Sequence, residues 1–305
     1  MARTDFFKLL RVAPGESAGL ASRDPAATAG LSRQDAASAL GPVSERLAHL
    51  QNLLYAGREH ALLVVLQGMD AAGKDGTIRH AFAPFNPQGV IVTSFKAPTE
   101  EEKRHDFLWR VHAHAPELGM TAIFNRSHYE DYLVGRGAGR LDGRAGARLL
   151  RQIRDFEALL ADNGVKILKF FLHISKEEQL ARFAKRLRDP DKNWKIAESD
   201  YATRLRWDDF QRAYEEALSE TSAPDAPWLV IPADQKWYRD AVVMDITAAA
   251  LDALDMRYPK PPVDLAMIER KYHAAVAEQK SGENGRKAEK NGRGGKADAP
   301  PDGAG

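Results

Sequence analysis

The chain has 305 residues, of which 44% are hydrophobic, a formal net charge of +1 and no cysteine. This size and apolar content suffice for one large α/β core, and the lack of cysteine excludes a disulfide framework and a thiolate metal site. The longest purely apolar run, residues 61–66, is too short to span a bilayer, and the first ten residues lack the apolar segment of a secretory signal. We therefore expect a cytoplasmic protein with no membrane partner.

The order of apolar segments along the chain predicts the fold class. Residues 1–43, which are rich in Ala, Gly, Pro and Ser, suggest an irregular N-terminal arm, and Ser44 can cap a helix over residues 44–55. Apolar and often β-branched runs then predict five strands, at residues 61–67, 90–95, 120–125, 165–174 and 228–231. Because helical segments separate these runs, we expect an α/β domain at 44–278 with a parallel sheet covered by helices on both faces. Residues 279–305, which are rich in Gly, Lys and Glu and lack aromatic residues, predict a disordered tail.

The first strand runs directly into the sequence Gly68-Met-Asp-Ala-Ala-Gly-Lys74, a Walker A pattern. Glycines allow the backbone to curl so that its N–H groups face an anion, and a helix starting near Lys74 adds its positive dipole end. Lys74 then brings a full charge to the phosphate oxygens. The alternative is a glycine-rich turn without a ligand. We expect phosphate or nucleotide binding by the loop and the first helical turn, at Ala71, Ala72, Gly73, Asp75, Gly76 and Thr77.

Two carboxylates depart from the usual motif, Asp70 inside the loop and Asp75 where a Ser or Thr normally follows the lysine. A bare carboxylate repels phosphate unless a divalent cation lies between them, and magnesium binds both kinds of oxygen. Asp70 is thus expected to bind Mg²⁺ or to orient the acceptor oxygen. For both residues the alternative is an acid that complements a helix N-terminus.

A second group of polar residues, Asn125, Arg126, Glu130 and Asp131, follows the third predicted strand. Ligands of open α/β sheets bind at the carboxyl ends of the strands. Arg126 can bind a transferring phosphoryl group with its planar guanidinium, and Asp131 is our second predicted magnesium ligand. The alternative is that Arg126 forms a structural ion pair with Glu130 or Asp131.

A basic stretch at residues 182–195 carries six basic and two acidic residues. Pro190 interrupts it, and a second helical pattern follows at 199–218, so we expect a two-helix lid over about 182–212. Arg186, Lys192 and Lys195 are its candidate phosphate ligands. A solvated surface is the alternative, and nucleic acid is not expected as a partner because few aromatic residues interleave with the charges.

Several motifs in this order resemble the second polyphosphate kinase family, the polyphosphate:nucleotide phosphotransferases. They are the loop at 68–79, Phe124-Asn-Arg-Ser-His-Tyr-Glu-Asp131, the lid pattern at 186–195, Arg206-Trp-Asp-Asp209 and Ala226-Pro-Trp-Leu-Val-Ile-Pro232. The resemblance spans about residues 8–260. It implies a P-loop-kinase-like fold with a helical lid, transfer of the terminal phosphoryl group of inorganic polyphosphate to a nucleoside mono- or diphosphate, magnesium, and a homo-oligomer. Asn125, Leu108-Trp-Arg-Val-His112 and Arg11-Val-Ala-Pro-Gly15 favour the subgroup that accepts both AMP and ADP.

By position, the resemblance implies that Asp70 and Lys74 act on metal and phosphate and that Arg126 steadies the transferring group. The expected activity is polyphosphate-driven formation of ADP and ATP, by direct in-line transfer. An ATP-dependent nucleoside monophosphate kinase and a non-enzymatic nucleic-acid-binding P-loop regulator remain as alternatives.

Overall fold

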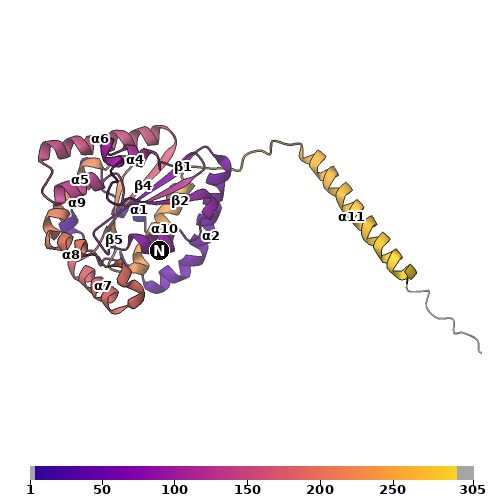
Figure 1. The fold of residues 1–305 in the computed structure, drawn as a ribbon, viewed down its shortest axis with the longest axis horizontal. Helices are drawn as coiled ribbons and strands as arrows, with labels where there is room; N and C mark the ends of the chain where they lie inside the picture. Colours follow the sequence, from indigo (N-terminus) through magenta and orange to yellow (C-terminus); the bar gives the residue numbers. More distant parts are fainter. Residues whose placement is uncertain (1–3, 294–305) are drawn as a thin grey trace, which may run out of the picture. The chain divides into compact units, whose positions relative to one another are not determined.

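The structure, a computed structural model, describes residues 4–293. The chain forms two compact units, one ending at Tyr258 and the other beginning at Pro259. The first unit contains a five-stranded sheet in the order β2-β3-β1-β4-β5 (Figure 1), in which every neighbouring pair is parallel. The strands are β1 (Ala61–Gln67), β2 (Val90–Ser94), β3 (Thr121–Asn125), β4 (Val165–His173) and β5 (Trp228–Pro232). The predicted parallel α/β sheet is therefore confirmed.

Strand β1 is the central strand of the sheet. Every one of its residues is buried, as expected for a strand covered by helices on both faces. It pairs with β3 on one side and with β4 on the other. The strand that follows β1 in the chain lies on the β3 side, whereas β4 and β5 lie on the other side. The strand order thus changes direction at β1, and a ligand site is expected at its carboxyl end.

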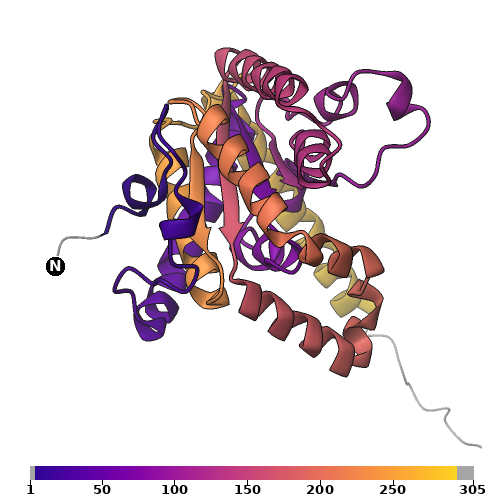
Figure 2. The ribbon, with the colours of Figure 1, turned by 90° about the vertical axis from the view of Figure 1, so that its left-hand side faces the viewer.

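Helices of the first unit cover both faces of the sheet (Figures 1 and 2). On one face α10 packs against α2 and α3, and on the other α9 packs against α5 and α6. The α-helices are α1 (Phe6–Leu10), α2 (Arg33–Gly57), α3 (Lys74–Ala81), α4 (Trp109–His112), α5 (Glu130–Gly137), α6 (Gly143–Asp162), α7 (Lys176–Arg188), α8 (Glu198–Leu205), α9 (Trp207–Thr221), α10 (Lys236–Asp252) and α11 (Leu265–Arg293). The short 3₁₀ turns are η1 (Leu20–Ser22), η2 (Pro87–Gly89), η3 (Glu102–Arg104) and η4 (Pro190–Lys195).

The N-terminal region is more ordered than the predicted irregular arm. The helix expected from Ser44 begins at Arg33, because Ser32 caps it by accepting a hydrogen bond from the Asp35 N–H, and Pro42 lies within it. Before this helix, the Val12 N–H donates to the Trp228 carbonyl at 2.8 Å. The arm is therefore attached to the edge strand β5.

The lid region is helical, as predicted, but the number and the bounds of its helices differ from the prediction. A helix ends at Arg188, the turn η4 begins at the predicted break, Pro190, and α8 and α9 follow (Figure 2). The single helix expected at 199–218 is broken at Arg206, whose φ of −104° and ψ of 28° are not helical. Three helices and a turn therefore replace the two-helix lid.

The second unit also differs from its prediction. The proline-rich segment that starts at Pro259 ends the first unit before the expected boundary at 278. The predicted disordered tail at 279–305 is helical over 279–293, where Ala, Lys, Glu and Arg favour a helix; residues 294–305 lie outside the described residues. Within residues 4–293, no helix combines the length and apolar character needed to cross a bilayer.

Candidate functional site

The segment after β1 forms the predicted loop, and α3 begins at Lys74. Gly68 and Gly73 have positive φ angles of 150° and 111°, which glycine adopts at little cost, and Ala71 between them has a φ of 62°, which is uncommon for a residue with a Cβ. A Cβ on Gly68 would lie 2.7 Å from the Leu172 carbonyl oxygen on β4. Close packing of the loop against the sheet therefore requires glycine at this position.

Side chains from α7 hold the carbonyl side of the loop. Arg182 donates through Nη1 to the carbonyls of Ala71 and Ala72, both at 2.9 Å, and Gln179 donates to the Asp70 carbonyl at 2.9 Å. In a trans peptide the N–H points opposite to the C=O, so the N–H groups across these planes face away from the α7 donors. One of them, that of Ala72, donates to the Met69 carbonyl at 3.1 Å.

Arg182 is an internal residue and does not face a ligand. It belongs to the basic stretch that we expected to face a polyanion, but it is buried and its guanidinium is used within the protein. A buttressing arginine and a ligand-binding arginine have the same sequence signal. The positive charge available to a ligand is therefore smaller than the composition of residues 182–195 suggests.

Lys74 lies along the loop with its ammonium near the first turn. Nζ donates to the Gly68 carbonyl at 2.7 Å and to the Met69 carbonyl at 3.3 Å. Burial lowers the pKa of Lys74, and the nearby positive charge of Arg126 lowers it further, against the opposing effect of Asp70. Among the described residues no carboxylate forms an ion pair with this ammonium, so its charge is available to an anionic ligand.

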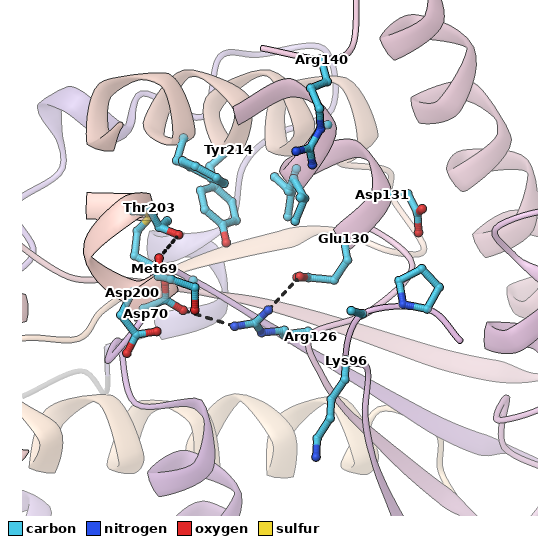
Figure 3. Close-up of a pocket in the computed structure, with 18 of the residues that line it drawn as sticks. Met69, Asp70, Lys96, Arg126, Glu130, Asp131, Arg140, Asp200, Thr203 and Tyr214 are labelled. Atoms are coloured by element: carbon cyan, nitrogen blue, oxygen red, sulfur yellow. Dashed lines mark hydrogen bonds and ion pairs between the residues drawn. The ribbon is translucent and has the colours of Figure 1, made fainter. Parts of the chain in front are cut away.

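Arg126 follows β3 and joins two carboxylates (Figure 3). Nη2 lies 3.2 Å from Asp70 Oδ1, and Nη1 lies 3.3 Å from Glu130 Oε2. Burial alone would lower the pKa of Arg126, but the charges of Glu130 and Asp70 raise it above its ordinary value. The side chain remains 43% exposed. The structural ion pair with Glu130 that we considered from sequence is present, and part of the guanidinium still faces the adjoining cavity.

This cavity has a volume of 530 Å³ and joins the loop to the end of β3 and to α8. Asp70, Arg126, Glu130 and Asp131 line it, as does Asp200 from α8 (Figure 3). Its other lining residues include three basic ones, Lys96, Arg110 and Arg140. A cavity of this size at the carboxyl ends of the strands, with both signs of charge, suits a phosphorylated ligand bound through a cation and basic side chains.

The two predicted metal ligands both line this cavity but occupy different parts of it. In Figure 3, Asp131 lies on the opposite side of Arg126 and Glu130 from Asp70, whereas Asp200 lies near Asp70. Burial raises the pKa of Asp200, and the charge of Asp70 raises it further. Burial also raises the pKa of Asp131. Among the described residues no group of three or more His, Cys, Asp or Glu side chains is arranged to hold a metal ion.

Magnesium does not require such a group, because it commonly binds one or two carboxylates and completes its shell with water and substrate phosphates. The Asp70 carboxylate beside an open cavity fits this requirement. The role of Asp131 as a ligand stays a prediction, and sequence reasoning gave no signal for Asp200.

The three lid candidates have different surroundings. Lys195 reaches the loop, where its Nζ lies 3.4 Å from Asp75 Oδ2, and the other oxygen of Asp75 accepts a hydrogen bond from Asn125 at 2.8 Å. Burial would raise the pKa of Asp75, but the Asn125 bond and the Lys195 charge lower it. Arg186 bonds within the lid, to Asp200 and the Lys195 carbonyl. Lys192 pairs with Asp189.

Two predicted phosphate-binding residues at the start of α3 face the protein. The Thr77 hydroxyl donates to the Gly73 carbonyl at 3.2 Å, and the side chain is buried. Gly76 lies against Arg239, whose Nη2 would be 3.2 Å from an added Cβ. Their backbone remains at the N-terminus of α3, so a direct role in phosphate binding stays a prediction.

The chain is similar to known proteins over most of its length. A family model described as "Polyphosphate kinase 2" matches residues 30–260. The chain is 49% identical over 256 residues to the AMP/ADP-polyphosphate phosphotransferase of Meiothermus ruber, covering 83% of this chain and 96% of that protein. It is 46% identical over 228 residues to the ADP-polyphosphate phosphotransferase of Rhodopseudomonas palustris, covering 71% and 79%. The solved structure of polyphosphate kinase 2 from Arthrobacter aurescens TC1 matches with a TM-score of 0.84 and 42% identity, covering 90% of this chain and 97% of that one.

Proposed function

We propose, because this chain belongs to the polyphosphate kinase 2 family, that the cavity beside the loop is where it transfers the terminal phosphoryl group of polyphosphate to AMP or ADP. The family makes the protein a polyphosphate-dependent nucleotide phosphotransferase with a P-loop-like α/β fold. The observation that carries the proposal is the convergence of Asp70, Arg126 and the lid residue Asp200 on one cavity.

The proposed chemistry relies on positioning and charge. Lys74, which has no carboxylate partner among the described residues, neutralises part of the phosphate charge. Arg126 offers a planar guanidinium held between two carboxylates, and so binds the transferring group in a fixed orientation. Lys195 lies at the loop and supplies positive charge from the lid.

Asp70 is the proposed magnesium ligand, with Asp131 as a second candidate. When bound, Mg²⁺ would supply charge neutralisation between the carboxylate and the phosphate oxygens. We propose direct in-line transfer without a phosphoenzyme. If the protein instead carries a covalent phosphate, incubation with labelled polyphosphate in the absence of acceptor will leave label on the denatured chain.

The acceptor, assembly and location are finer proposals. The match to a protein named for AMP and ADP supports the use of both acceptors. We propose a homo-oligomer in the cytoplasm that does not bind nucleic acid. Sedimentation of the purified protein with and without polyphosphate tests the oligomeric state, and a nucleic-acid titration with a salt series tests the last point.

The test of the proposed function is a comparison of donors. Purified protein is incubated with Mg²⁺ and either ADP or AMP, together with long-chain polyphosphate or, for AMP, with ATP. We expect ATP from ADP and ADP from AMP when polyphosphate is the donor, and loss of product when EDTA is added. Product from AMP with ATP alone and none with polyphosphate would favour a nucleoside monophosphate kinase.

A further inference from the structure

The last residue of β1, Gln67, is linked to Arg126 through the carboxylate of Glu130. Its side chain is fully buried, and its backbone is fixed in the sheet, where it is in register with Phe171 on β4. Nε2 donates to Ser127 Oγ at 3.0 Å and to Glu130 Oε1 at 3.2 Å. Both N–H groups of the amide are therefore used, and both acceptors belong to the segment that contains Arg126.

The orientation of the amide is set by its donor end. Gln67 Oε1 is buried and has no hydrogen-bond partner among the described residues. An unpaired buried acceptor costs stability, and a flipped amide would turn its oxygen toward the Glu130 carboxylate, which would repel it. Gln67 therefore leaves its Oε1 unpaired, and its Nε2 donates two hydrogen bonds in return.

These bonds extend into a continuous chain of contacts that reaches the phosphate loop. Glu130 accepts from Gln67 through Oε1 and from Arg126 Nη1 through Oε2, and Arg126 Nη2 reaches Asp70 (Figure 3). A carboxylate with one oxygen fixed by a buried amide has little freedom to rotate, so its second oxygen defines where the guanidinium lies. The backbone adds a constraint, since Arg126 has a φ of 63°, in the left-handed region.

We infer that Gln67 is a positioning residue, which fixes Arg126 through Glu130 so that the guanidinium presents one edge to the phosphoryl group. This inference rests on the proposed function and deepens it. Gln67 is not in the cavity lining and needs no contact with substrate. Its effect is on the geometry of transfer, where a displacement of about 1 Å is enough to reduce turnover by about 10²-fold.

The polarity of the contact provides a sharp test, because it can be reversed. In the Gln67→Glu variant two carboxylates face each other, and in Glu130→Gln the amide has one oxygen, so it cannot accept at both of the positions that Oε1 and Oε2 of Glu130 occupy. In the double variant, the amide introduced at position 130 would donate through its nitrogen to the carboxylate introduced at position 67 and would accept from Arg126 through its oxygen. The Ser127 hydroxyl can donate to the same carboxylate at position 67. The exchange restores a hydrogen bond at each of these contacts and keeps the net charge, while the negative charge moves from position 130 to position 67.

The experiment measures kcat and KM for ADP, at saturating polyphosphate, in the wild type, Q67E, E130Q and Q67E/E130Q. We expect each single variant to lose about 10²-fold in kcat with KM changed less than about threefold, and the double variant to recover to within about fivefold of the wild type. Single variants that keep their kcat, or a double variant as poor as the singles, would overturn the inference.

Two further variants separate positioning from general damage. Gln67→Met keeps the shape of the side chain and introduces no charge, so it is expected to fold and to lose kcat like Q67E. The matched control is Gln51→Met, another fully buried glutamine, whose Oε1 accepts from the Asn86 N–H at 3.1 Å outside the site. We expect Q51M to keep kcat within about twofold. Equal losses in Q51M and Q67M would make the effect structural and contradict the inference.

The position of Arg126 can also be read without turnover, from crystal structures of the four proteins. We expect its guanidinium between Asp70 and Glu130 in the wild type, in the equivalent place in the double variant, and displaced in the singles. An undisplaced guanidinium in the singles contradicts the inference even if the protein uses polyphosphate. A wild type that uses no polyphosphate rejects the proposed function, and the crystal structures still decide the role of Gln67.

Discussion

Two internal lysines of this protein have opposite surroundings. One is Lys169 on β4, at the centre of a buried ionic cluster that we define as His128, Tyr129, Glu157, Lys169 and Thr221. Its Nζ donates to Glu157 Oε2 at 2.6 Å, to the Tyr129 hydroxyl at 3.1 Å and to the Thr221 carbonyl at 2.8 Å. An ammonium has three N–H donors, so this one is saturated by the protein.

The other is Lys74 in the phosphate loop, which has two carbonyl acceptors and, among the described residues, no ion-paired carboxylate. Burial lowers the pKa of both lysines, but among the described residues only Lys169 forms an ion pair with a carboxylate, that of Glu157; the charges of Asp70, Glu130 and Asp75 act on Lys74 without reaching ion-pair distance. A charge that is paired and fully hydrogen-bonded inside the protein contributes to structure, and one in the phosphate loop that has no ion-paired carboxylate is available to a ligand. We therefore expect the buried ionic cluster to contribute to stability and the loop to contribute to activity, and variants in each region can test this.

The largest effect is expected at the loop. Replacing Lys74 with alanine should lower turnover by about 10³-fold, which is about 4 kcal/mol of transition-state stabilisation, with little change in thermal unfolding. Initial rates with polyphosphate and ADP, measured beside differential scanning calorimetry, check both parts. A large fall in melting temperature would show that Lys74 also supports the fold and would break the comparison.

The matching change in the buried ionic cluster is Lys169→Met. It leaves Glu157 buried without its cation and should lower the free energy of unfolding by about 3–5 kcal/mol, while the folded fraction keeps most of its activity. Urea unfolding measures this change. The double variant Lys169→Met/Glu157→Leu removes both charges and should be less destabilised than the single one; an equal or greater loss would mean that the pair itself is not the source of the effect.

A smaller loss is expected when Arg126 is replaced by lysine. The charge is kept, but an ammonium is a point charge and lacks the planar fork that contacts both carboxylates through one edge and leaves another for phosphate. Turnover should fall by about 10²-fold, equivalent to about 2.7 kcal/mol. Steady-state kinetics with polyphosphate as donor provide the measurement, and an unchanged kcat would assign Arg126 a structural role.

The smallest effect concerns the lid. Lys195→Ala removes one partly exposed charge near Asp75 and should raise KM for polyphosphate by about three- to tenfold at low salt, with a smaller change at high salt because exposed charges are screened. Arg257, which is exposed and paired with Asp255 in another part of the chain, provides the matched control. Equal changes in Lys195→Ala and Arg257→Ala would indicate a general charge effect.

The parts of the molecule that were predicted from sequence depend on local patterns. An apolar run followed by glycines and a lysine defines β1, the loop and the start of α3, since burial and backbone freedom are encoded within a few consecutive residues. The third strand and the break at Pro190 were predicted for the same reason.

What was missed depends on contacts between distant segments. Arg182 binds the carbonyl of a residue 111 positions away, and its basic side chain gave no sign that it would be buried. Gln67 was predicted only as the last residue of the first strand, because its partners belong to the segment that follows β3, and β3 pairs with β1 only in the folded sheet. The early start of α2 was missed because residues 1–43, rich in Ala, Gly, Pro and Ser, suggested an irregular arm and Ser44 a cap, whereas the helix accommodates Pro42.

The most direct test of the central claim, that polyphosphate-dependent transfer takes place at the loop, uses Asp70→Ala. The wild type and this variant are incubated with Mg²⁺, long-chain polyphosphate and ADP, and ATP is quantified while thermal unfolding is recorded on the same samples. We predict ATP from the wild type and none above background from the variant, with both proteins folded. ATP formed by the folded variant at nearly the wild-type rate would contradict the assignment of the site.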